Sequence, residues 1–206
     1  MTPIRFYHHP LSGHAHRVRL FMSLLKLPFE AIEVDLLRGE QKRPEFLALN
    51  PFGQVPVIQD GDVTLADSNA ILTYLALRYG GDEGGHWLPR DPVGAAQVQR
   101  WLSVAAGPLV NGPGNARVNN LFRRPHDPRC GEIAHTLFTR LDTHLATQPF
   151  LVGEHATIAD IALHTYTAHA PEGGVSLQPF AHMRAWLERV EALPGFVGMA
   201  RSPVAP

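Results

Sequence analysis

Two short segments of the sequence carry groups that could hold a small peptide. Val55-Pro56 lies within the run 50–58, and Asp67-Ser68 opens an apolar helical pattern further along. A proline that enters a strand cannot donate a ladder hydrogen bond, and a cis bond before it turns the N–H and C=O of Val55 toward a ligand. A helix N-terminus suits a ligand carboxylate, while the Asp67 side chain suits an ammonium. The segments therefore predict a site for a small peptide that is zwitterionic at one end.

Composition and charge exclude several classes of partner. The 206 residues are 45% hydrophobic and 18% charged, with a formal net charge of -1. Such a chain can bury the core of one large domain or two small ones, and it lacks the basic stripe that nucleic-acid binding requires.

The single cysteine, Cys130, excludes an intramolecular disulfide and favours a reducing compartment. The sequence shows no signal-peptide pattern and no bilayer-spanning run, so we expect a cytoplasmic protein with no membrane partner.

The elements that position these groups form an α/β layer. Hydrophobic periodicity and turn residues, including the hairpin signal Asp60-Gly61-Asp62, give the order β-α-β-α-β-β-α over residues 1–80. The expected strands are 4–7, 29–34, 57–58 and 63–65, and the expected helices begin near His14, lie within 40–49 and span 67–79.

A glycine-rich run from residue 80 to 85, followed by Pro89 and Pro92, predicts a linker over 81–91. No strand pattern follows it, so residues 92–206 are expected to form an all-α domain. Pro108 and Gly112-Pro113-Gly114 should kink or interrupt its first helix. The expected helices are 93–110, 132–145, 158–168 and 182–193.

The start of the third of these helices carries a capping signal. Thr157 is placed to cap the helix and Asp160 to close a capping box before an apolar run, with Gly153 shortly upstream. We interpret this signal as a marker of a well-capped core helix and not as a binding site.

Together these segments resemble the cytosolic glutathione transferase family over nearly the whole chain. The N-terminal half is similar to its thioredoxin-like domain, with Asn50-Pro51 and Val55-Pro56 as the cis-proline signature and Asp67-Ser68 as the γ-glutamyl site. The C-terminal half is similar to its helical domain, and the segments 171–174 and 184–196 resemble the end of many bacterial members. The resemblance implies glutathione as co-substrate, attack of its thiolate on a small electrophile, and a homodimer.

The resemblance also implies which group activates the thiol. The loop serine Ser12, in the stretch 10–19, is similar to the serine of the theta- and zeta-like classes, where the hydroxyl donates to sulfur. Alternatives are Tyr7 at the end of the first strand, His14, or a backbone N–H. Ser12 could also serve as a helix N-cap. Cys130 lies too far along the chain to act as a catalytic cysteine at this position.

Other glutathione contacts are implied by position. Val55 would pair with the cysteinyl backbone of the ligand, and Gln54 would reach its glycyl or γ-glutamyl groups. Gln41 and Lys42 lie where the family meets the glycyl carboxylate, although related sequences often have histidine and lysine there. Lys42 could equally be an ordinary solvated lysine.

No sequence motif identifies the residues of the pocket for the electrophile. Its apolar wall is predicted to include Leu11, Trp101, Ala105 and Pro108. Alternatively, Trp101 could simply pack in the core, and Pro108 could kink the helix without lining a pocket. The chain has 12 histidines but no HExxH pattern or Cys/His pairing, so we expect no metal site.

The sequence leaves more than one function open. The first hypothesis is a glutathione transferase for small hydrophobic electrophiles, including a glutathione-dependent isomerase or dehalogenase, with detoxification as its role. The second is a non-catalytic protein that binds glutathione or an apolar ligand, and the third is an assembly module of the same fold. In a homodimer, Phe52 could be an apolar key between subunits, or it could pack locally.

Overall fold

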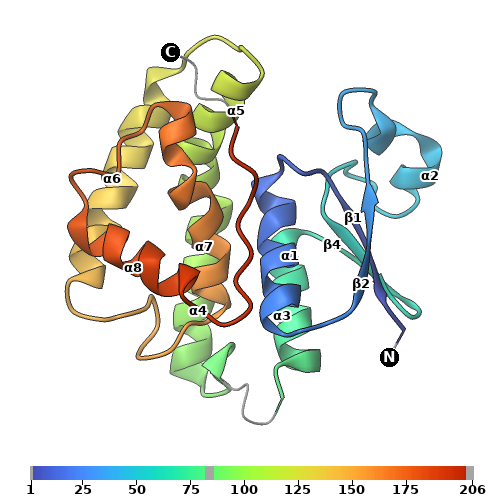
Figure 1. The fold of residues 1–206 in the computed structure, drawn as a ribbon, viewed down its shortest axis with the longest axis horizontal. Helices are drawn as coiled ribbons and strands as arrows, with labels where there is room; N and C mark the ends of the chain where they lie inside the picture. The colour runs from blue at the N-terminus through green and yellow to red at the C-terminus, as the bar shows by residue number, and fades with distance from the viewer. Residues whose placement is uncertain (1, 82–85, 203–206) are drawn as a thin grey trace.

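The computed structural model of the chain describes residues 2–81 and 86–202. A four-stranded sheet with its helices is followed by a part made of helices (Figure 1). Residues 82–85 of the expected linker lie outside the described residues. The elements are β1 (Ile4–His8), α1 (Gly13–Leu24), β2 (Phe29–Glu33), η1 (Glu40–Lys42), α2 (Pro44–Leu47), β3 (Val57–Asp60), β4 (Val63–Ala66), α3 (Ser68–Tyr79), α4 (Pro92–Ala106), η3 (Val110–Gly114), α5 (Asn115–Leu121), α6 (Pro128–Leu145), α7 (Ile158–Ala168), η4 (Ala170–Gly173) and α8 (Ala181–Glu191).

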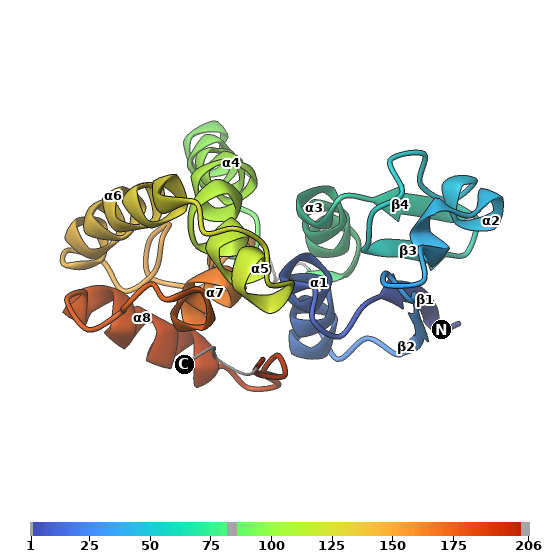
Figure 2. The same ribbon diagram turned by 90° about the horizontal axis from the view of Figure 1, so that it is seen from above.

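The sheet has the strand order β2-β1-β3-β4. β1 pairs in parallel with β2 and antiparallel with β3, so Phe6 lies between Ala31 and Ile58, and β3 continues into an antiparallel hairpin with β4. α1 and α3 lie between the sheet and the helical part, while α2 lies beyond the sheet (Figure 2). The thioredoxin-like order β-α-β-α-β-β-α is thus confirmed, and residues 86–202 contain helices without strands.

Local capping explains where the helices of the second half begin. Asp91 and Asp127 accept hydrogen bonds from the first turns of α4 and α6, and a proline at the first helical position follows each of them. Thr157 and Asp160 form the predicted capping box of α7. Side-chain oxygens thereby satisfy N–H groups that a helix start leaves without partners.

The predicted interruption after α4 takes the form of a wider turn and a separate helix. Beyond Pro108 the chain forms η3, a π-helical segment that contains Pro113, and then continues as α5. The sequence analysis predicts an interruption here but assigns no helix to residues 115–121, where the structure has α5. Here the wider turn absorbs the proline and lets the helix resume.

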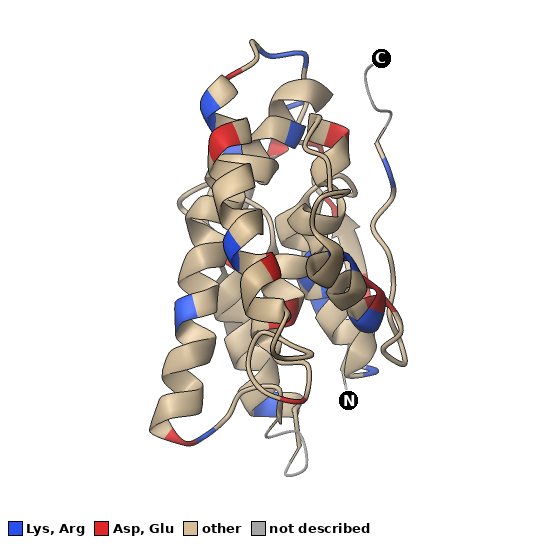
Figure 3. Cartoon of the chain, turned by 90° about the vertical axis from the view of Figure 1, so that its left-hand side faces the viewer, with Lys and Arg blue, Asp and Glu red and all other residues tan. Residues whose placement is uncertain are grey.

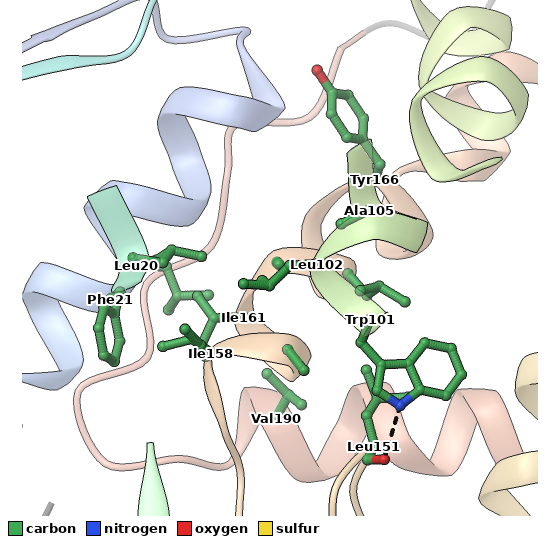
Figure 4. Close-up of a cluster of buried hydrophobic side chains, with 14 of the residues drawn as sticks. Leu20, Phe21, Trp101, Leu102, Ala105, Leu151, Ile158, Ile161, Tyr166 and Val190 are labelled. Carbon is green, nitrogen blue, oxygen red and sulfur yellow. Dashed lines mark hydrogen bonds between the residues drawn. The ribbon is translucent and has the colours of Figure 1, made fainter. Parts of the chain in front are cut away.

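One hydrophobic core spans both halves of the molecule. Every residue of α7 from Ile158 to Thr167 is buried, and α7 packs against both α1 and α4. Leu20 and Phe21 of α1 face Ile158 and Ile161 of α7 in this cluster (Figure 4). The α/β half therefore buries one side of α1 against the helical half.

Positions of Lys and Arg are interspersed with positions of Asp and Glu along the backbone on the side shown in Figure 3. That side is the helical one, which faces away from the sheet. None of the helices in the described ranges is both long and apolar enough to cross a bilayer.

Candidate functional site

A cavity of about 700 Å³ opens where the loop after β1, the turn before β3 and the start of α3 meet. It collects most of the residues that the sequence singles out for peptide binding. The predicted residues on its wall are Ser12, Gln41, Gln54, Val55, Asp67 and Ser68.

The turn before β3 offers free backbone groups to this cavity. The Val55–Pro56 peptide bond is cis. Asn50 is buried and ties the turn together, since its Nδ2 donates to the Gln54 carbonyl at 2.7 Å and its Oδ1 accepts from the Phe52 N–H at 3.1 Å. Within the described residues, neither the N–H nor the C=O of Val55 has a hydrogen-bond partner. An extended ligand can therefore pair with Val55 as a neighbouring strand would.

Asp67 adopts an unusual backbone conformation at the start of α3. Its φ of 70° and ψ of 122° lie in a region that L-residues rarely occupy. Its Oδ1 accepts from the N–H groups of Asn69 and Ala70 at 2.9 and 3.0 Å, which caps the helix. The exposed carboxylate thus keeps its other oxygen for a ligand, and strain of this kind is typical of binding sites.

A buried positive charge lies behind Ser68. Arg17 is fully buried on α1, and its Nη1 donates to Ser68 Oγ at 3.3 Å and to Asn69 Oδ1 at 3.1 Å. Its Nε and Nη2 have no hydrogen-bond partner among the described residues, and its guanidinium carbon lies 5.7 Å from the centroid of the Tyr166 ring. Burial lowers the pKa of Arg17 to about 10, so the group stays protonated at neutral pH. The start of α3 therefore combines a helix dipole with a cation, a combination suited to a carboxylate.

His14 borders the same cavity as a neutral ring. Its Nδ1 lies 3.3 Å from Ser68 Oγ, and its ring meets Tyr166 edge-on. Burial lowers the pKa of His14 to about 3, with a smaller contribution from Arg17. His14 is therefore an uncharged polar neighbour of the site at physiological pH.

Ser12 combines two roles at the start of α1. Its Oγ accepts from the Ala15 N–H at 3.2 Å, so it is the N-cap of the helix. Because this bond uses a lone pair, the hydroxyl proton stays available to a group in the cavity. Tyr7, the alternative, donates its hydroxyl to Gln59 Oε1 at 2.9 Å and does not line this cavity.

Gln41 and Lys42 occupy different positions. Gln41 reaches the cavity with a buried Oε1 that has no partner among the described residues, while its Nε2 donates to the Leu36 carbonyl at 3.3 Å. Such an acceptor suits an N–H group better than a carboxylate. Lys42 is exposed and is not on the cavity wall, and its Nζ donates to the carbonyls of Phe52 and Gly53 at 3.3 Å each.

The residues predicted for the apolar pocket are not gathered at one cavity. Leu11 lies in the loop beside Ser12, and Ala105 is fully buried in the core. Trp101 and Pro108 line a separate cavity of about 680 Å³ between α4 and α6. The reason is that α4 turns this side toward α6, and Trp101 Nε1 donates at 3.1 Å to the carbonyl of Leu151, which lies in the loop between α6 and α7 (Figure 4).

Arg17 is the site residue that the sequence analysis did not identify. It occupies the same helical face as Phe21 and Leu24, four and seven residues further on. An arginine within an apolar stripe was the available signal. Among the described residues, no group of three or more His, Cys, Asp or Glu side chains is arranged to hold a metal ion.

Comparisons with known proteins agree on one family. Residues 11–78 match the family model described as Glutathione S-transferase, N-terminal domain, and residues 126–194 match that of the C-terminal domain. The chain is 37% identical over 212 residues to Glutathione S-transferase 3 of Zea mays, covering 95% of this chain and 92% of the relative. It is 30% identical to Glutathione S-transferase theta-3 of Mus musculus, covering 90% and 80%.

A solved structure shows the same arrangement. The glutathione S-transferase from Pseudomonas fluorescens superposes with a TM-score of 0.89 at 34% identity, over 96% of this chain and 99% of that one.

Proposed function

Because the chain belongs to the glutathione S-transferase family, we propose that it binds glutathione in the 700 Å³ cavity and directs the thiolate at a small hydrophobic electrophile. The observation that carries this proposal is the convergence of three features on one cavity. These features are the free backbone of Val55, the start of α3 at Asp67 and Ser68, and the hydroxyl of Ser12.

The tripeptide lies extended along the turn before β3. Its cysteinyl N–H and C=O pair with Val55, and its ammonium meets the free oxygen of Asp67. Its α-carboxylate lies at the start of α3, where Ser68 and the Arg17 charge behind it favour an anion. The unpartnered Gln41 Oε1 accepts an N–H of the ligand. This arrangement places the thiol toward Ser12.

Ser12 stabilises the thiolate. A free thiol has a pKa near 8.5, and the thiolate is the nucleophile. A hydrogen bond to a charged group contributes about 1.5–3 kcal/mol, and the start of α1 adds a positive dipole end.

Leu11, beside Ser12, forms part of the apolar wall for the electrophile. Consumption of reactive electrophiles is a detoxification activity, and the free, buried Cys130 suits a cytoplasmic location.

The protein acts as a homodimer in this proposal. Phe52 leaves 79% of its surface exposed at the rim of the glutathione cavity. The cavity between α4 and α6 presents Trp101, Pro108 and Leu137, which suit an aromatic ring. In a two-fold dimer each copy places Phe52 in the other copy's cavity, and a two-fold contact uses the same surfaces twice.

A second candidate function is glutathione binding without turnover. The observation that favours it is the capping bond of Ser12, because a serine could be retained for the helix alone. The two functions differ in the ionisation of the bound thiol.

Ultraviolet absorbance of the thiolate, followed against pH in the complex, separates the two functions. For a transferase we expect a thiol pKa at least one unit below that of free glutathione. Ser12→Ala should raise this pKa and slow conjugation by about one to two powers of ten. Ser12→Asp keeps a good N-cap but cannot donate when ionised, so it should lose activity while α1 stays stable. An unshifted thiol pKa supports the binder, and calorimetry that detects no binding of millimolar glutathione removes both functions.

A further inference from the structure

Arg117 joins three distant segments of the chain behind the loop that carries Ser12. It lies on α5 with 1% of its surface exposed. Its Nε donates to Glu172 Oε2 at 2.6 Å, its Nη1 to the Leu11 carbonyl at 2.9 Å, and its Nη2 to Ser202 Oγ at 2.8 Å. A planar guanidinium is the side chain that can reach three separate acceptors with fixed geometry.

The carbonyl that Arg117 holds belongs to the peptide group between Leu11 and Ser12. At the other end of that group, the Ser12 N–H donates to the His9 carbonyl at 3.0 Å. Because a peptide group is planar, two anchored ends fix its orientation and hence the direction in which the Ser12 side chain leaves the backbone. The bond from the Ala15 N–H to Ser12 Oγ then sets the hydroxyl.

Arg117 is itself rigidly held. Its carboxylate partner Glu172 is buried and also accepts from His169 Nδ1 at 2.5 Å. Burial opposes ionisation of Glu172, but the hydrogen bonds from His169 and Arg117 together lower its pKa. The backbones of η4 and α5 also pack closely, since a Cβ on Gly173 would lie 2.5 Å from the backbone nitrogen of Arg117. The ion pair between Arg117 and Glu172 in the helical half thus holds the loop that carries Ser12 in place.

We propose that Arg117 is a positioning residue for Ser12: it orients the Leu11–Ser12 peptide group, so that the helical half controls how far the bound thiol is ionised. This role rests on the proposed function of Ser12. It assigns Arg117 no contact with glutathione or with the electrophile. Replacement of Arg117 should therefore change the pKa of the bound thiol and not the affinity for the tripeptide.

The test compares Arg117→Lys with the wild-type protein. Lysine keeps the charge, but a single ammonium cannot hold the Leu11 carbonyl and Glu172 in the same geometry. We expect the pKa of the bound thiol, measured by ultraviolet titration, to rise by about one unit. We also expect kcat to fall about tenfold while the Kd for glutathione, measured by calorimetry, changes less than about threefold.

Arg189→Lys is the matched control. Arg189 also donates to a backbone carbonyl, from its Nε to Pro149 at 2.8 Å, but neither residue lines the glutathione cavity. This variant should keep the wild-type thiol pKa. If Arg117→Lys does not fold, Glu172→Gln replaces it, because it keeps the shape of the pair and removes the charge that anchors Arg117. It should raise the thiol pKa by a smaller amount.

The outcomes separate the two proposals. A wild-type thiol pKa equal to that of free glutathione overturns the role of Ser12, and the role of Arg117 with it. A lowered wild-type pKa that stays the same in the folded variants overturns the role of Arg117 alone. A Kd that weakens tenfold with an unchanged thiol pKa also rejects it, because Arg117 would then support binding in general.

Discussion

The Nη1 of Arg17 donates to the Oγ of Ser68 across 3.3 Å, and no carboxylate forms a hydrogen bond with this arginine among the described residues. A buried charge without such a partner is costly. It lies directly behind the helix start that we assign to the α-carboxylate of glutathione. Asp67 acts on Arg17 through space without a hydrogen bond. We therefore expect the α-carboxylate of the ligand to add the negative charge that pairs with this cation.

Replacement of Arg17 should therefore separate stability from binding. We expect Arg17→Met to weaken glutathione binding about tenfold, or about 1.4 kcal/mol, by calorimetry. The free energy of unfolding without ligand should fall by less than this or should rise, because the variant removes a desolvated charge. Arg19→Met, on the exposed side of α1, should change neither quantity. Unchanged affinity in Arg17→Met would show that the charge does not act on the ligand.

Asp67 should bind the ammonium of glutathione while it caps α3. Asparagine tolerates a positive φ and is a good N-cap, so the free energy of unfolding of Asp67→Asn should lie within about 0.5 kcal/mol of the wild-type value. Loss of the charge should weaken glutathione binding by about 1 kcal/mol, or about fivefold. An analogue of glutathione that lacks the amino group tests the cause, because wild type and variant should bind it equally. A fivefold loss for the analogue too would contradict the assignment.

Phe52 should control dimer formation. Phe52→Ser removes the ring that we place in the α4–α6 cavity of the second copy, and we expect a monomer at micromolar concentration by sedimentation. Leu37→Ser is the control, because Leu37 is equally exposed, at 79%, and does not line either cavity. It should remain a dimer. Wild-type protein that sediments as a monomer would rule out this interface.

Stability should fall in mild acid because of His16. The ring is buried between Thr165 Oγ1 at 2.8 Å and the Val197 carbonyl at 2.9 Å, and burial lowers its pKa from 6.5 to about 3. Below pH 6.5 the unfolded chain takes up a proton that the folded chain excludes, so stability is lost as the pH falls toward 3. Between pH 7 and pH 5 this histidine should account for about 2 kcal/mol.

Urea unfolding at the two pH values measures this loss. His16→Gln does not titrate and keeps an amide N–H for the Val197 carbonyl, so its stability should fall less steeply with pH than that of the wild type. His182→Gln, on the exposed surface of α8, should keep the wild-type slope. Equal slopes in all three proteins would mean that other groups cause the loss.

Local signals predicted much of the fold. The capping box of Thr157 and Asp160 lies within four residues of sequence, and the structure forms it as expected. The strand and helix order of the first half likewise follows from short-range periodicity. That Val55, Asp67 and Ser68 line one cavity was predictable for the same reason, since they lie close together in the chain.

The remainder depends on contacts between distant segments. The position of Trp101 depends on how α4 is rotated against α6, and no local sequence pattern determines that rotation. Its indole N–H donates to Leu151, and the residue does not line the 700 Å³ cavity. Arg117 binds groups at residues 11, 172 and 202, a combination that appears only when the chain has folded.

The packing of α7 against α1 sets a limit on dissection of the molecule. A fragment that ends at Tyr79 would leave Leu20 and Phe21 in contact with water, although both are fully covered in the whole chain. Such a fragment should aggregate on expression, even though it contains every residue to which we assign a contact with glutathione. A chimaera that grafts this half onto another protein must therefore also include a helix with the apolar surface of α7.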